Sequence, residues 1–347
     1  MKLKRFFLFF VAVCLLPLSM VYPPSLWGQT EAEQLKWYHD KTINLIVPHG
    51  AGGGFDIYAR LVAPFFKKHI PGVNIIVQNI TGAGGLRGRN QVYTARPDGL
   101  TIGFTTGAGM IFSVWSGLEG VQFDLRKMNY LGRIAYESQV LALSNRGPLK
   151  SFQDLKKAGR PIKLGFSGVG SDDYYTTAII ASYFGYKTDP ITGYSGSREA
   201  NLAAVRGEVD GVQVQASSLM PLFKSGDLIP VLTLAYKRDP ELPNVPTAIE
   251  LAETPEAREI ALAMTNIFVV DRLFFAPPDI APSRLNFLRR TFDKIVDDRE
   301  FLEYANKAKR PVDPLKGEEV ERLVREILKV GEQKIQPLVR EIAKQAR

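Results

Sequence analysis

The stretch NLIVPHGAGGGFDIYARLV, residues 44–62, runs from an apolar segment through four glycines into an aspartate and an amphipathic segment. Glycine has no Cβ atom, so a glycine-rich bend between a strand and a helix lets a ligand approach backbone N–H groups at the positive end of the helix dipole. The bend therefore favours an anion as ligand. Aspartate is also a good N-cap residue, and we expect Asp56 to cap the helix that follows.

Apolar runs and amphipathic segments alternate along most of the chain. This alternation predicts a parallel α/β sheet in the first part and a second α/β domain from about residue 161. The predicted strands lie at 43–48, 73–79, 100–106, 162–168, 189–196 and 209–214, and the predicted helices at 56–69, 86–95, 173–184 and 198–206.

Two extended segments are expected to connect the domains. Residues 130–143 predict a crossover into the second domain, and residues 265–282 predict a return. Helices predicted at 283–297, 299–309 and from 318 to the end would then complete the first domain. We expect lobe 1 to comprise residues 40–137 and 267–347, and lobe 2 to comprise residues 138–266.

The N-terminus has the pattern of an export signal. Three basic residues precede an apolar run at 6–22, and the first acidic residue is Glu31. This layout predicts a signal peptide over residues 1–28 and a periplasmic protein, with an uncleaved anchor as the alternative. Cys14 is the single cysteine, so the exported part would have neither disulfides nor thiolate chemistry.

The charge of the chain argues against nucleic acid as a partner. Removing the basic residues of the predicted leader, Lys2, Lys4 and Arg5, lowers the formal charge from +8 to about +5. This modest excess suits small anions but is too diffuse for a nucleic-acid surface.

Enzymes that use glycine-rich loops are disfavoured by missing partners. No Gly-Lys pair completes a P-loop, and Phe55 and Arg87 stand where the last glycine of a dinucleotide motif belongs. No G-x-S-x-G elbow is present, and the histidines, His39, His49 and His69, all lie in the first quarter. We therefore expect no catalytic residue, no metal site and no cofactor.

Three further glycine- or serine-rich junctions follow predicted strands: QNITGAGGLRGRN at 78–90, FSGVGSDDYY at 166–175, and TGYSGSREA at 192–200. Asp172 or Asp173 is expected to cap the helix after the second of these. Such junctions, two from each domain, would face one crevice of an open α/β protein and suit an anion held between lobes.

Seven segments, in order and spacing, resemble one known family: INLIVPHGAGGGFDIYARLVAP, NITGAGGLRGRN, ARPDGLTIGF, YLGRIA, GYSGSREANLAAVRGEVDG, LPNVPTAIE and FFAPPDIAPSRLNFLRRTFDKIVDD. From Lys41 to its end the chain is similar to the periplasmic solute receptors of tripartite tricarboxylate transporters, the Bug proteins. The resemblance implies a type II periplasmic-binding-protein fold with two α/β lobes joined by two crossover segments. It also implies capture of a small carboxylate in the interdomain cleft and delivery to integral-membrane permease subunits; we expect a monomer.

The resemblance also implies a binding site built from several loops, with backbone amides and water doing much of the binding. Its members here are His49, Gly50, Ala51, Gly52, Gly53, Gly54, Asp56, Asn79, Gly82, Ala83, Gly84, Gly85, Thr105, Thr106, Gly107, Ser167, Gly168, Gly170, Ser171, Tyr194, Ser195 and Gly196, to which we add Gln213 and Gln215.

Several of these positions depart from the family pattern. His49 replaces a commonly aromatic residue, Tyr174 or Tyr175 stands where a histidine often occurs, and Gln213 and Gln215 replace an apolar strand end. An aliphatic, an aromatic or a weakly charged acid therefore remains open as ligand. Two other functions also remain open: an extracytoplasmic hydrolase or transferase, and a ligand sensor for a membrane kinase.

Overall fold

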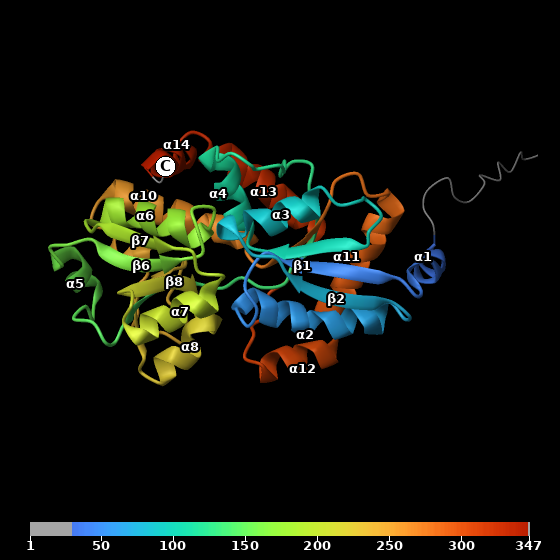
Figure 1. The fold of residues 1–347 in the computed structure, drawn as a ribbon, viewed down its shortest axis with the longest axis horizontal. Coiled ribbons are helices and arrows are strands. Elements are labelled where there is room, and N and C mark those ends of the chain that lie inside the picture. The colour runs from blue at the N-terminus through green and yellow to red at the C-terminus, as the bar shows by residue number, and fades with distance from the viewer. Residues whose placement is uncertain (1–29, 346–347) are drawn as a thin grey trace, which may run out of the picture.

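Two β-sheets, each flanked by helices, divide the chain into two lobes (Figure 1). The computed structural model describes residues 30–345, so the export signal predicted over residues 1–28 lies outside the described residues. In the described part, no helix is both long and apolar enough to cross a membrane.

The sheet of lobe 1 has the strand order β11-β4-β10-β3-β1-β2. The strands β1 (Thr42–Val47), β2 (Asn74–Asn79) and β3 (Thr101–Thr105) are parallel, as predicted. Strand β10 (Leu273–Ala276) lies antiparallel between β3 and β4 (Asn129–Arg133), and β11 (Leu315–Lys316) pairs with the edge of β4. Strand β10 lies in the part of the chain predicted only as a return segment, and it is antiparallel because it enters the sheet from the opposite direction on its return from lobe 2.

Helices cover both faces of the lobe 1 sheet. Ile43, Leu45 and Val47 of β1 share one apolar cluster with α2 and α11, whereas Ile46 belongs to a cluster with α3 and α4. This split follows from the two-residue period of a strand. The helices are α1 (Glu31–Tyr38), α2 (Gly54–His69), α3 (Leu86–Tyr93), α4 (Gly107–Ser116), α11 (Pro282–Val296), α12 (Arg299–Lys307) and α13 (Gly317–Gly331), with the 3-10 turn η1 (Ala83–Gly85) before α3.

The sheet of lobe 2 has the order β7-β6-β8-β5-β9. Strands β6 (Ile162–Phe166), β7 (Thr188–Thr192) and β8 (Gly211–Gln215) are parallel, while β5 (Gln139–Ser144) is antiparallel to β8 and to β9 (Leu228–Leu234). Pro190 lies on the edge strand β7, where the missing N–H is tolerated. The helices are α5 (Phe152–Lys157), α6 (Asp172–Phe184), α7 (Ser197–Arg206), α8 (Ala216–Lys224), α9 (Ala248–Leu251) and α10 (Pro255–Ile267).

The chain passes between the sheets at residues 134–138, which join β4 to β5, and again after α10, through the 3-10 turn η2 (Phe268–Val270) into β10. The predicted fold class, two α/β lobes joined by two crossovers, is confirmed. Helix α14 (Ile335–Gln345) packs against both α4 and α6 (Figure 1), so the C-terminal helix contacts both lobes.

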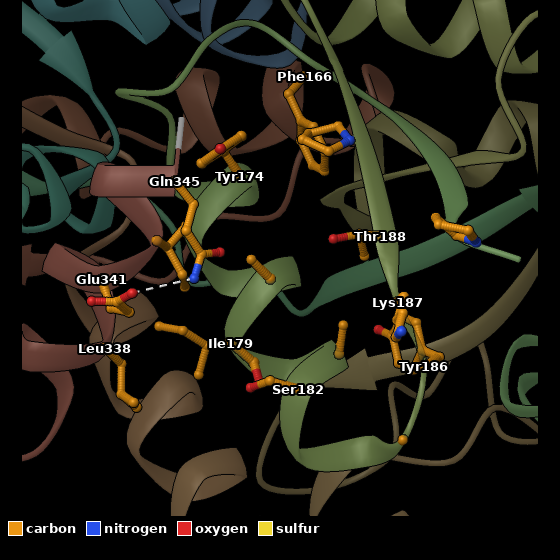
Figure 2. Close-up of a pocket in the computed structure, with 16 residues that line it drawn as sticks. Phe166, Tyr174, Ile179, Ser182, Tyr186, Lys187, Thr188, Leu338, Glu341 and Gln345 are labelled. Atoms are coloured by element: carbon orange, nitrogen blue, oxygen red, sulfur yellow. Dashed lines mark hydrogen bonds between the residues drawn. The ribbon is translucent and has the colours of Figure 1, made fainter. Parts of the chain in front are cut away.

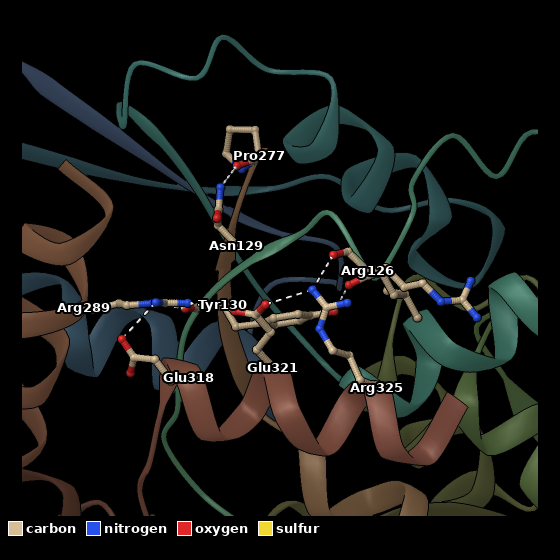
Figure 3. A network of polar contacts seen from close by, with 9 residues as sticks. Arg126, Asn129, Tyr130, Pro277, Arg289, Glu318, Glu321 and Arg325 are labelled. Atoms are coloured by element: carbon tan, nitrogen blue, oxygen red, sulfur yellow. Dashed lines mark hydrogen bonds and ion pairs between the residues drawn. The ribbon is translucent and has the colours of Figure 1, made fainter. Parts of the chain in front are cut away.

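A polar network fixes α13 beside the start of β4 (Figure 3). Arg289 donates to the carbonyl oxygen of Tyr130 at 2.8 Å and to Glu318 at 2.9 Å. Arg325 donates to the carbonyl oxygen of Arg126 at 2.9 Å. These bonds hold α13 against β4, the strand from which the chain leaves lobe 1.

Candidate functional site

The side chain of Asp56 holds the first glycine bend in its conformation. Helix α2 begins at Gly54 with Gly53 at the N-cap, so the expectation that Asp56 caps it is wrong. Asp56 lies in the first turn, and its carboxylate accepts from the amide of Gly52 at 2.8 Å and from Arg60 at 3.0 Å. Burial opposes ionisation, but these hydrogen bonds lower the pKa of Asp56 overall. A charged Asp56 therefore fixes the shape of the loop.

The third junction departs from expectation in the same way. Ser171 occupies the N-cap position of α6, so neither Asp172 nor Asp173 is the cap. The Ser171 hydroxyl donates instead to the carbonyl oxygen of Gly168 at 2.7 Å, which tightens the turn. Both aspartates lie in the first turn of α6, where the helix dipole favours negative charge.

A small cavity of about 30 Å³ lies between the lobes. Its wall contains five residues that the sequence predicted, His49, Ser167, Gly196, Gln213 and Gln215, and seven that it missed, Phe55, Gln139, Asp172, Asp173, Ser197, Ala200 and Val214. A water needs roughly 10–15 Å³ of such space, so the cavity holds about two waters in this closed arrangement. A larger ligand requires the lobes to stand further apart.

The predicted glycines meet one another across the two lobes. The amide of Gly50 donates to the carbonyl oxygen of Ser195 at 2.9 Å. A Cβ atom on Gly84 would lie 2.4 Å from the amide nitrogen of Ser171, and one on Gly196 would lie 2.8 Å from that of Gly50. We call this backbone contact, formed by Gly50, Gly84, Gly168, Gly170 and Gly196 with their neighbours, the glycine seam.

Other predicted residues support the loops from outside the cavity. Gly53 donates to the carbonyl oxygen of Gly50 at 3.3 Å, and Gly85 to that of Gly82 at 3.0 Å. The Asn79 side chain donates to the carbonyl oxygen of His49 at 2.9 Å. Gly54, Ala51, Ala83, Ser195 and Tyr194 are likewise outside the cavity wall.

Thr105, Thr106 and Gly107 connect the end of β3 to the cavity wall. Arg89 donates to the Thr105 hydroxyl oxygen at 3.3 Å, and that hydroxyl lies 3.2 Å from Nε2 of His49. Thr106 caps α4 and donates to Asp172 at 3.3 Å. Gly107 is packed so closely that a Cβ atom would lie 2.1 Å from the carbonyl oxygen of Val270.

His49 lies at the cavity as a neutral ring. Burial, followed by the positive charges of Arg89 and Arg272, lowers the pKa of His49 well below its ordinary value. Its ring stacks on Phe55 with centroids 4.3 Å apart, so His49 makes a ring contact at a position that is commonly aromatic in the family pattern. His49 therefore offers hydrogen bonds to a ligand but no charge.

Two buried arginines lie beside the cavity. Arg89 is fully buried and joins the lobes, because it donates to the carbonyl oxygens of Gly109 in lobe 1, at 3.1 Å, and Gly170 in lobe 2, at 3.3 Å. Arg272, at the second crossover, is also fully buried and forms an ion pair with Glu137 of the first crossover. The crossovers are thus tied together by opposite charges.

The aspartates of the cavity wall hold protons unusually strongly. Burial, together with repulsion from Asp271, raises the pKa of Asp172 to about 6. Burial and the neighbouring charge of Asp172 raise the pKa of Asp173 to about 8. The sequence pattern predicted that one of these two aspartates caps the helix. Only the tertiary structure places both of them on the cavity wall.

Comparison with known proteins decides the family. Residues 58–341 match the family described as tripartite tricarboxylate transporter family receptor, TctC. The chain belongs to the TctC family. A UPF0065 protein of Cupriavidus necator is 26% identical over 283 residues, which cover 80% of each chain, and the protein BugT of Bordetella pertussis is 26% identical over 62% of this chain and 67% of its own.

Solved structures share the fold of this TctC protein. The periplasmic binding protein BugD superposes with a TM-score of 0.71 at 21% identity, covering 85% of this chain and 98% of its own. MatC of Rhodopseudomonas palustris, solved with bound malate, superposes with a TM-score of 0.72 at 22% identity, covering 86% and 99%. TctC proteins are substrate-binding receptors, so the enzyme alternative is set aside.

A larger cavity of the TctC chain, about 910 Å³, lies away from the glycine seam between α6, β7 and α14 (Figure 2). Tyr174 lines it, with its ring against Phe166 at a centroid distance of 5.7 Å, whereas Tyr175 is buried against Phe112. Neither tyrosine lines the central cavity, so the tyrosine-rich sequence of α6 is no argument for an aromatic ligand.

Proposed function

We propose that this TctC protein is a periplasmic receptor that binds a small organic acid between its lobes and delivers it to a tripartite tricarboxylate-type permease. The observation that carries the proposal is the central cavity, which lies at the carboxyl ends of strands from both sheets and is closed by the glycine seam. Receptors of this shape trap a ligand by hinge bending about their crossovers. The predicted lobe boundaries, 40–137 with 267–347 and 138–266, are part of this proposal.

The start of α2 is the proposed position of the ligand carboxylate. Helix geometry leaves the amides of Gly54, Phe55 and Asp56 without intrahelical acceptors, and Phe55 lies on the cavity wall. Helix N-termini bind anions through such amides and the helix dipole. MatC with malate, and a second R. palustris protein solved with adipate (TM-score 0.71, 21% identity, covering 88% of this chain and 97% of its own), support a carboxylate as ligand class.

Binding is tested by thermal unfolding of the purified protein in the presence of mono-, di- and tricarboxylates and of aromatic acids. A true ligand at 100 times its Kd stabilises the folded state by about 2.7 kcal/mol, which raises Tm by several degrees. Calorimetry then gives the affinity. If no acid changes Tm and calorimetry detects no binding, the receptor function is rejected.

Delivery is tested separately by uptake of the identified acid into cells. Deleting the gene for this chain should abolish uptake, and the wild-type chain should restore it. A variant that binds the acid but fails to restore uptake would locate a permease contact, whereas full uptake without the chain would contradict the transport role.

A further inference from the structure

Lobe 2 contributes an acidic wall to the central cavity. Asp172 and Asp173, in the first turn of α6, both line the cavity. The Asp172 side chain accepts a hydrogen bond from Thr106 of lobe 1 at 3.3 Å, and the Asp173 side chain accepts one from the amide of Tyr174 at 3.0 Å. Asp173 is only partly buried, so a ligand in the cavity can reach its carboxylate.

Few positive charges compensate this wall among the described residues. Arg272 is engaged by Glu137, and the neutral ring of His49 contributes no charge. Arg89 remains as a cation, but it faces both Asp172 and Asp173, while the charge that acts on Asp271 is that of the already engaged Arg272. The interior therefore holds more carboxyl groups than free cations.

Gln213 gives an independent sign of a ligand at the same wall. Its side chain is 1% exposed and lines the cavity, and its Oε1 accepts from Thr177 at 3.0 Å. Its Nε2 has no hydrogen-bond partner within residues 30–345. A buried amide donor without an acceptor is unfavourable, so a ligand oxygen or a bridging water is needed there.

We propose that Asp172 and Asp173 select an acid whose second polar end is an N–H donor, as in an amino-acid zwitterion, and reject a dicarboxylate. The inference rests on the proposed function, which places the ligand carboxylate at the start of α2. The ammonium or amide N–H groups then donate to the aspartates, and the Nε2 of Gln213 donates to a ligand oxygen. Within residues 30–345 no group of three or more His, Cys, Asp and Glu side chains is arranged to hold a metal ion.

At pH 7.5 a second ligand carboxylate at this wall would face the charged Asp172, whose pKa is about 6, and Asp173, whose pKa is about 8, would have to keep its proton. Like charges in a poorly solvated cavity repel strongly, whereas a ligand ammonium is attracted and favours ionisation of both aspartates. The neighbours that hold malate and adipate accommodate dicarboxylates. This chain therefore differs from them in the proposed ligand class.

The test compares ligands that differ only at their second end. Isothermal titration calorimetry at pH 7.5, on protein purified after expression of the full chain, would use three pairs: β-alanine with succinate, 4-aminobutyrate with glutarate, and 5-aminopentanoate with adipate. The common L-amino acids and the other dicarboxylates from malonate to pimelate complete the panel. We expect the tightest ligand to carry an N–H donor and to bind at least about tenfold more tightly than its matched dicarboxylate.

The variant D172N/D173N tests what the two aspartates contribute to ligand preference, apart from the rest of the site. It should lose at least about tenfold in affinity for the N–H ligand and gain affinity for dicarboxylates, because asparagine keeps the shape but removes the charge. D189N, a change on β7 outside the cavity, should leave the preference unchanged. The inference is overturned if a dicarboxylate is the tightest ligand of the wild type, or if the preference for the N–H ligand survives in D172N/D173N. Either result leaves the proposed receptor function standing. If no acid of any kind binds, the proposed function fails as well.

Discussion

The amide of Gly50 in lobe 1 donates to the carbonyl oxygen of Ser195 in lobe 2 over 2.9 Å. The two lobes thus touch through backbone atoms at the edge of the central cavity. Such contact is possible because the residues that meet there are glycines, whose missing Cβ atoms leave room for a second backbone. The glycine bends consequently serve closure as well as the proposed anion binding.

Replacing Gly84 with alanine should prevent full closure. The added Cβ atom would lie 2.4 Å from the amide nitrogen of Ser171, closer than atoms can pack. We expect at least about a tenfold loss of ligand affinity and a larger radius of gyration by small-angle X-ray scattering.

Gly226 provides the matched control for this change. Both glycines have positive φ, +62° and +76°, but nothing lies within 4 Å of a Cβ atom on Gly226. Gly226→Ala should therefore share only the backbone penalty, about 1–2 kcal/mol, and retain affinity. Equal affinities and equal radii for the two variants would show that the seam plays no part in closure.

Breaking the buried ion pair between the crossovers should destabilise the protein strongly. Arg272 is fully buried, its Nη1 and Nη2 have no hydrogen-bond partner within residues 30–345, and its ion pair is formed with Glu137. Glu137→Gln should lower the free energy of unfolding by about 3–5 kcal/mol, measured by urea denaturation. Glu303→Gln, which breaks an exposed pair with Arg299, should change it by less than about 1 kcal/mol. A loss of similar size in both variants would contradict this assignment.

The wall aspartates should make stability fall as pH rises from about 4 to 8. The pKa values of Asp172 and Asp173 in the folded state, about 6 and about 8, exceed the ordinary value of 3.8, so the folded protein binds more protons than the unfolded chain in this range. Stability then decreases with increasing pH and levels off above the folded pKa values.

D172N/D173N should remove this slope and raise Tm at pH 8.5 relative to the wild type. Asp298, whose hydrogen bond from Lys68 lowers its pKa to about 2, acts in the opposite direction and in a separate range. Its contribution disappears as pH falls from about 4 to 2, so the two effects can be read from one series of melting curves. Parallel Tm curves for wild type and variant between pH 4 and 8 would refute the raised values.

The imidazole of His49 should remain neutral at pH 6. The Thr105 oxygen accepts from Arg89, and we expect the Thr105 hydroxyl to donate to Nε2 of His49, which would place the ring proton on Nδ1. Nitrogen-15 NMR of the histidine ring should report this tautomer without titration between pH 6 and 8. A midpoint inside that range would contradict the buried, cation-flanked environment.

The substitution His49→Phe tests what the hydrogen bond of the His49 ring contributes. Phenylalanine keeps the stacking on Phe55 but loses the hydrogen bond to Thr105. We expect folding to survive with a loss of about 1 kcal/mol, while the preference among acids changes.

Local patterns in the sequence determined most of the elements around the site. Strand-to-helix alternation predicted β1, β2, β3, β6, β7 and β8 within a few residues, because apolar periodicity is a property of neighbouring residues. The four glycine- or serine-rich junctions were also recognised, and they do meet between the lobes. Helix α4 was not predicted, since its almost wholly apolar sequence GAGMIFSVWS has no amphipathic period.

Only the tertiary structure decided what the junctions do. The antiparallel insertion of β10, the contact of Gly84 with Ser171, and the joining of Arg272 to Glu137 depend on how two crossovers fold back on each other. The positions of Asp172 and Asp173 on the cavity wall depend on the same arrangement. The sequence by itself determined that glycine bends end the strands of two α/β lobes; the pairing of residues far apart in the chain decided that these bends close on one another beside an acidic wall.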